Sequence, residues 1–146
     1  MTRRVRAFRL VIAVAAGATL VACESSERRD AESVLAAIGR FRTADNAAIP
    51  AAVDALKATP CTAPDACRTR DACLAAGEPT AKALRLKAEV ERGLDALEKG
   101  TLAKDSPEAQ DMPRKLEEAE ELLNEGRAAL AECDEQVRAL KRKHRI

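Results

Sequence analysis

The stretch that decides the fold spans residues 116–140 and reads LEEAEELLNEGRAALAECDEQVRAL. It contains no proline, and its apolar or small side chains recur at alternating steps of three and four residues, which is the spacing of one face of an α-helix. These residues form a seam of Leu116, Ala119, Leu123, Gly126, Leu130, Cys133, Val137 and Leu140. Because the seam keeps a heptad period, this helix is expected to pack lengthwise against another helix.

A neighbouring segment offers a matching seam. Residues 79–100 carry their own row at steps of three and four: Ala83, Leu86, Val90, Gly93 and Leu97. The connection between the two segments is short, which favours antiparallel neighbours within one chain. We therefore predict that the last two helices form an antiparallel hairpin. The alternative is a parallel coiled coil that joins copies of the chain through the seam of residues 116–140.

Capping residues and prolines set the other helix boundaries. The pattern predicts helices over residues 28–43, 46–60, 62–77 and 79–100, and a last one that starts at Ser106 or Asp111. Asn46 and Thr62 are the expected N-caps of the second and third helices, and Pro79 is expected to separate the third from the fourth. The fold class is therefore all-α, a small disulfide-stapled domain of about five helices over residues 31–146.

Composition narrows the possible partners. Beyond residue 22 the chain has 124 residues, of which alanine supplies 26 and Leu, Ile, Val and Phe together 21. Phe41 is the only aromatic residue in this part, so base-stacking and sugar-stacking surfaces are excluded. Four of the 25 basic residues lie before residue 22, which leaves 21 against 24 acidic residues and a net charge of about −3. No nucleic-acid partner is expected.

The N-terminus has the form of an export signal. A basic leader with arginines at positions 3, 4, 6 and 9 precedes an apolar run over residues 10–21. That run is shorter than the roughly 20 residues that a membrane-spanning helix needs. A short apolar core behind a basic leader is typical of a cleaved signal peptide.

The run ends in Leu20-Val21-Ala22-Cys23, which resembles the lipobox of bacterial lipoproteins. The resemblance covers residues 1–23 and implies that residues 1–22 are cleaved and that Cys23 carries a covalent lipid, the only added group expected. Two or three acyl chains hold a protein on a membrane durably. Residues 23–30 would then be the lipidated cysteine and a polar tether, with the body in the periplasm. By analogy with enterobacterial sorting, Glu24 favours the outer over the inner membrane.

The four remaining cysteines are expected to form disulfides in an oxidising compartment. Cys67 and Cys73 would lie about 9 Å apart along a helix, too far for a bridge. Cys61 can fold back onto Cys67 more easily than onto Cys73. If the hairpin turns near residue 105, Cys133 also lies close to Cys73. The preferred pairs are therefore 61–67 and 73–133.

No catalytic motif is present, so the chain is not expected to be an enzyme. A metal site made of the cysteines and His144 is disfavoured by their spacing. His144, in the basic tail of residues 141–145, is expected to be a solvated residue. That tail would favour the negative end of its helix, with contact to anionic lipid or cell-wall polymer as the alternative.

Two functions remain after these exclusions. The first is a non-catalytic envelope lipoprotein with a structural or adaptor role, which presents a helical face to an unknown protein partner. The alternative is a small-ligand carrier with a pocket between its helices.

Overall fold

The computed structural model describes residues 18–146, with side chains from Ser26 onward. The described part is all-helical and comprises four helices: α1 (Ala18–Thr43), α2 (Ile49–Lys57), α3 (Pro64–Glu98) and α4 (Pro107–His144). None of these helices is long and apolar enough to cross a membrane.

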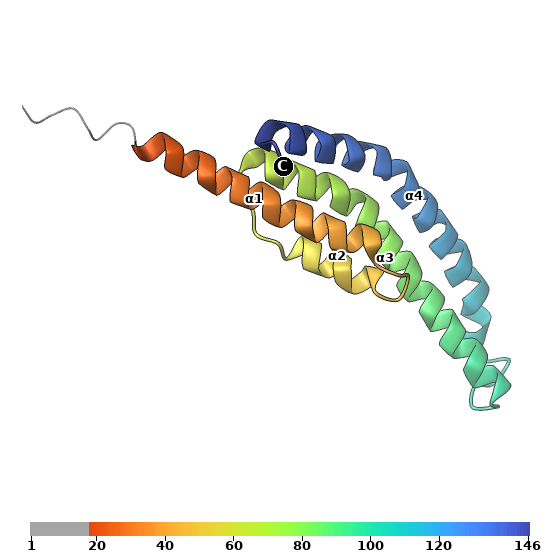
Figure 1. Ribbon diagram of the computed structural model, residues 1–146. Coiled ribbons are helices and arrows are strands. Elements are labelled where there is room, and N and C mark those ends of the chain that lie inside the picture. The colour runs from red at the N-terminus through yellow and green to blue at the C-terminus, as the bar shows by residue number, and fades with distance from the viewer. Residues whose placement is uncertain (1–17) are drawn as a thin grey trace, which may run out of the picture.

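The two long helices, α3 and α4, form an antiparallel hairpin that runs the length of the molecule (Figure 1). Contacts along it pair Asp65 with His144, Thr69 with Gln136, Cys73 with Cys133, and Glu89 with Lys115. Successive contacts lie further along α3 and earlier along α4, so the two helices pair in antiparallel register. The helix start at Ser106 is confirmed, because its Oγ accepts a hydrogen bond from the backbone N–H of Ala109 at 3.2 Å.

Helices α1 and α2 cover only part of this hairpin (Figure 1). The main core cluster draws Ala31, Val34, Ala37, Ile38 and Phe41 from α1 and Val53 and Leu56 from α2, and its last member on α3 is Ala81. We call α1, α2, residues 64–85 and residues 120–144 the base. Residues 86–119, none of which belongs to this core cluster, are called the arm.

The prediction of five helices is wrong in one respect, because the expected third and fourth helices are a single helix. Pro79 lies inside α3 without ending it. Proline removes one backbone hydrogen bond, here to the carbonyl of Ala75. Ala75 is exposed, so water can satisfy that carbonyl. Pro79 therefore bends α3 without ending it, and both helices of the hairpin curve midway (Figure 1).

Two predicted N-caps are also wrong. The N-cap position of α2 is Ala48, and its backbone N–H donates to Asp45 Oδ1 at 2.9 Å, so Asp45 stabilises this turn in place of Asn46. The N-cap position of α3 is Ala63, and no side chain of its own segment caps it. The hydroxyl of Thr62 donates instead to Asp30 of α1.

Helix α1 ends at Thr43 as predicted but begins before residue 28. It includes residues 24–30, which we expected to be a tether, so these residues form helical turns that continue into the core-facing part of α1. The leader over residues 1–17 lies outside the described residues, as does the side chain of Cys23. The predicted lipidation therefore stays a prediction.

Candidate functional site

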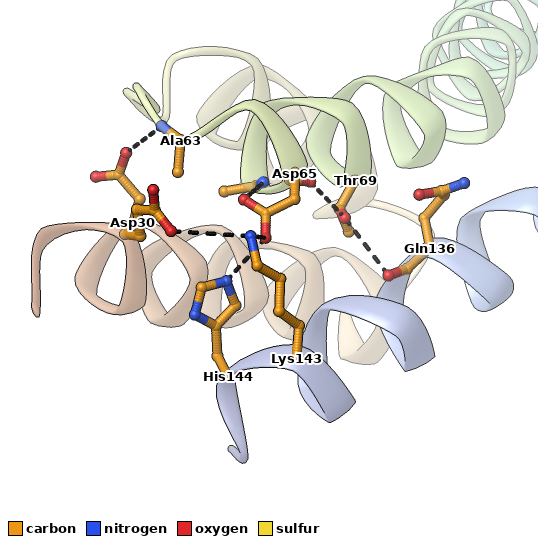
Figure 2. A network of polar contacts seen from close by, with 9 residues as sticks. Asp30, Ala63, Asp65, Thr69, Gln136, Lys143 and His144 are labelled. Carbon is orange, nitrogen blue, oxygen red and sulfur yellow. Dashed lines mark hydrogen bonds and ion pairs between the residues drawn. The ribbon is translucent and has the colours of Figure 1, made fainter. Parts of the chain in front are cut away.

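Polar side chains from three helices gather at the end of the base where α3 begins and α4 ends. They are Asp30 of α1, Thr62 just before α3, Asp65 in the first turn of α3, and Lys143 and His144 in the last turn of α4. We call these five residues the polar cluster. Figure 2 shows Asp65 facing the two basic side chains of α4, with Asp30 beside Ala63.

Asp65 is the centre of the polar cluster. Its Oδ2 lies 2.7 Å from Lys143 Nζ and 2.9 Å from His144 Nε2, while its Oδ1 accepts from the backbone N–H of Ala66 at 3.0 Å. Partial burial by itself raises the pKa of Asp65, but the hydrogen bonds from Lys143 and His144 outweigh it and lower that pKa to about 2. The same contact raises the pKa of Lys143. This carboxylate therefore ties the start of α3 to the end of α4.

Asp30 ties α1 to the same end of α3. Its Oδ2 accepts hydrogen bonds from the backbone N–H of Thr62 at 2.6 Å, from the Thr62 hydroxyl at 2.7 Å and from the backbone N–H of Ala63 at 2.9 Å. Backbone hydrogen bonds from Thr62 and Ala63 lower the pKa of Asp30. A carboxylate at a helix N-terminus also interacts favourably with the helix dipole. Asp30 therefore caps α3 from a distance of more than thirty residues in sequence.

The expectation that His144 is a solvated tail residue is wrong. Its side chain is only 6% exposed, and its one ion-pair partner among the described residues is Asp65. Because α4 runs antiparallel to α3, the last turn of α4 is brought back over the first turn of α3, and the imidazole is enclosed there. By contacting His144 Nε2, the Asp65 carboxylate joins the end of α4 to the start of α3.

A pocket of about 340 Å³ opens beside the polar cluster and has a basic lining of Arg28 from α1 and Lys143, His144 and Arg145 from the end of α4. Lys143 and His144 are already paired with Asp65. Arg28 contacts Glu32 through its Nε at 3.0 Å, which leaves its two terminal nitrogens without a hydrogen-bond partner in the described chain. Arg145 has no ion pair among residues 26–146. The chemistry that this pocket suits is the binding of an anion.

Two disulfides staple the base. Cys61 is bonded to Cys67 and Cys73 to Cys133, with Cα–Cα distances of 5.4 and 4.5 Å. These are the pairs that the helix geometry predicts from sequence. The first bridge folds the segment before α3 onto its opening turns, and the second joins α3 to α4 in the interior, where both cysteines are fully buried.

The other predicted sites have simple positions in the structure. All four body cysteines are in disulfides, His144 lies by Asp65 rather than by sulfur, and no group of metal-binding side chains occurs among the described residues. Four further acids lie at 117–118 and 120–121 of α4: Glu117, Glu120 and Glu121 are exposed, whereas Glu118 is half-buried and contacts Lys82 of α3 and Arg114.

The heptad seam divides between two environments. Ala119, Gly126, Cys133, Val137 and Leu140 are buried, whereas Leu116 is 45% and Leu130 is 38% exposed. The small residues of α4 allow the close approach of α3, and two of the leucines turn outward. The matching seam of α3 faces α4 as predicted, with Ala83, Val90 and Gly93 buried.

Sequence reasoning placed Asp65 only in a helix start and gave Asp30 no role beyond the polar tether. A usable signal was present, because the hairpin register that brings Cys133 to Cys73 also brings the basic end of α4 to the acid in the first turn of α3. Comparison with protein-family models, with curated proteins and with solved structures found no match.

Proposed function

We propose that this chain is a non-catalytic lipoprotein of the bacterial cell envelope, anchored through Cys23 and acting as a structural or adaptor protein. The observation that carries the proposal is the separation of two ends. The start of α1, which leads from Cys23, lies at one end of the molecule, and the tip of the arm lies at the other (Figure 1). An anchor at the first end would leave the arm projecting away from the membrane.

The surface of the arm supports an adaptor role. Leu94 and Leu116 are 50% and 45% exposed, and both belong to the arm. Large apolar side chains are scarce in this chain, so two on the exposed part of the arm are available for a protein partner.

The carrier alternative has less support. The pocket in the arm, of about 470 Å³, is lined largely by polar and charged side chains, among them Glu89, Arg92, Glu108 and Lys115. A second pocket, beside Pro79, is bordered by Glu78, Lys82 and Glu125. Sites for small apolar ligands are usually lined by apolar and aromatic groups.

The anchor is tested by Cys23→Ala in cells. We expect the wild-type protein in the membrane fraction with a mass that includes covalent lipid, and the variant either released or retained as an uncleaved precursor. A wild-type protein that is wholly soluble and has an unmodified N-terminus would remove the basis of the proposal.

The adaptor role is tested by placing a photo-crosslinking residue at Leu94 or Leu116 in intact cells. The matched control places it at Arg40, an exposed position of α1 in the base. A discrete cross-linked species from the arm positions but not from Arg40 would support the adaptor role. Equal labelling from all three positions would count against it.

A further inference from the structure

We infer that the basic pocket beside the polar cluster binds the phosphate headgroups of anionic phospholipids in the membrane to which the chain is anchored. The inference rests on the proposed anchor at Cys23 and adds a second, non-covalent contact with the same membrane. The pocket is lined by Arg28, Lys143, His144 and Arg145, as described above.

The first argument is position. Cys23 and Arg28 belong to the same helix and are five residues apart, which is about 7.5 Å along the helix axis. The headgroup layer on each side of a bilayer is about 5–8 Å thick. If the lipid on Cys23 is inserted, Arg28 therefore lies at the depth of the headgroups whether α1 stands upright or tilts.

The second argument is charge. Among residues 26–146, Arg145 has no ion pair and the terminal nitrogens of Arg28 have no hydrogen bond, so both arginines can contact phosphate while Arg28 Nε keeps its contact with Glu32. Arginine presents a fork of N–H donors that matches phosphate oxygens. Two further basic side chains of the tail, Lys141 and Arg142, are exposed on the same last turn of α4.

The acidic groups nearby are already engaged. Asp65 is held by Lys143 and His144, Glu32 by Arg28, Asp30 by Thr62 and Ala63, and Glu27 lies 3.8 Å from Lys143. The pairing holds Lys143 and His144 against Asp65 and leaves Arg145 and the terminal nitrogens of Arg28, which we call the cationic rim, to contact an anion. An anionic headgroup is the occupant that this rim fits at this depth.

The test uses residues 24–146 without a lipid. Every buried core residue of the described chain lies between Ala31 and Leu140, and both disulfides lie within the same range, so this chain keeps the whole core. Its binding is measured by co-sedimentation with vesicles of phosphatidylglycerol and of phosphatidylcholine at the same ionic strength. Binding only to phosphatidylglycerol is expected.

The variants Arg28→Gln and Arg145→Gln should each weaken binding to phosphatidylglycerol about fivefold, which corresponds to about 1 kcal/mol per basic residue at an anionic surface. The matched control for each variant, Lys87→Gln or Arg92→Gln, removes the same single charge from an exposed position of the arm. It should change binding less than twofold. Circular dichroism of each variant verifies that it is folded.

Three results would overturn the inference. The first is no binding to phosphatidylglycerol vesicles, and the second is an equal loss of binding in the pocket and control variants. The third is that inorganic phosphate alone binds saturably and as tightly as vesicles do, as read from NMR shifts of the pocket residues. The vesicle experiment needs no lipid on Cys23, and the fractionation of Cys23→Ala needs no pocket. Failure of the anchor and failure of the pocket are therefore separate outcomes.

Discussion

The base and the arm are built from the same alanine-rich helices but are held together differently. In the base, α1 and α2 cover α3, two disulfides cross between segments, and the polar cluster joins three helix ends. In the arm, the buried residues are only Val90, Gly93, Met112 and Ala119, with ion pairs such as Lys115 to Glu89 at 2.9 Å along the outside.

The comparison shows how a chain with few large apolar residues forms a stable body. Two helices alone bury little apolar surface, so the arm is expected to open locally at a lower free energy than the base. The base compensates for its small side chains with two disulfides, as small cores commonly do, and with the polar cluster that joins three helix ends.

The largest effect is expected from removing the bridge inside the base. Cys73→Ser with Cys133→Ser opens a loop whose ends are 60 residues apart, and the chain-entropy estimate is a loss of about 4 kcal/mol in unfolding free energy. Urea denaturation of the oxidised protein measures it. The paired control, Cys61→Ser with Cys67→Ser, opens a loop with a separation of 6 and should lose about 2 kcal/mol. Equal losses would show that the long bridge does not dominate the stability of the base.

A smaller loss of stability is expected from a substitution at Gly126, where α3 and α4 approach closely near the bend of the hairpin. A Cβ at Gly126 would lie 2.8 Å from the backbone carbonyl oxygen of Ala76 and would also meet Thr80 Oγ1, so Gly126→Ala must push the helices apart. A loss of about 1–3 kcal/mol is expected from thermal or chemical denaturation.

Two other glycines provide controls for this experiment. At Gly93 in the arm an added Cβ would meet only the flexible side chain of Met112, so Gly93→Ala should cost less than Gly126→Ala. Gly39 has open space around it, and Gly39→Ala should stabilise α1 by about 0.5–1 kcal/mol. A neutral Gly126→Ala would contradict the close approach of α3 and α4.

The smallest loss of stability is expected from removing the charge of Asp65 in the polar cluster, and this loss depends on pH. Because the pKa of Asp65 is lowered to about 2 from an ordinary value near 3.8, its contribution to stability is complete above about pH 4 and is lost as the pH falls through 2. Asp65→Asn should cost about 1–2 kcal/mol at pH 7, and the difference from wild type should shrink as the pH falls towards 2. Denaturation curves at several pH values measure this difference.

Glu89→Gln is the control for the arm, because the Glu89 ion pair is exposed. It should have a small effect at every pH, since exposed pairs contribute little. A pH-independent loss for Asp65→Asn would show that the lost contact matters through its shape rather than its charge.

Most of the correct predictions came from the spacing of apolar and capping residues within one helix. The seam of α3 that faces α4 and the helix start at Ser106 follow from spacing within a single segment, and the hairpin of the last two helices follows from two matching seams. The failures involve contacts between distant segments. Thr62 does not cap α3 because the helix begins one residue later, with Ala63 at the N-cap, and Asp30 of α1 accepts the N–H groups there. His144 is enclosed because the hairpin brings it to Asp65, 79 residues earlier in sequence.

The sequence by itself determined the helical class, the face of α3 that packs on α4 and the choice among cysteine pairs, because each depends on the fixed rise and period of a helix. Tertiary structure alone decided that Pro79 bends a helix instead of ending it, since this depends on whether the freed carbonyl of Ala75 is exposed. It also decided the polar cluster and the basic pocket. The hairpin register brings the end of α4 to Asp65, but both features also need α1, and no local spacing encodes where Asp30 and Arg28 of α1 lie.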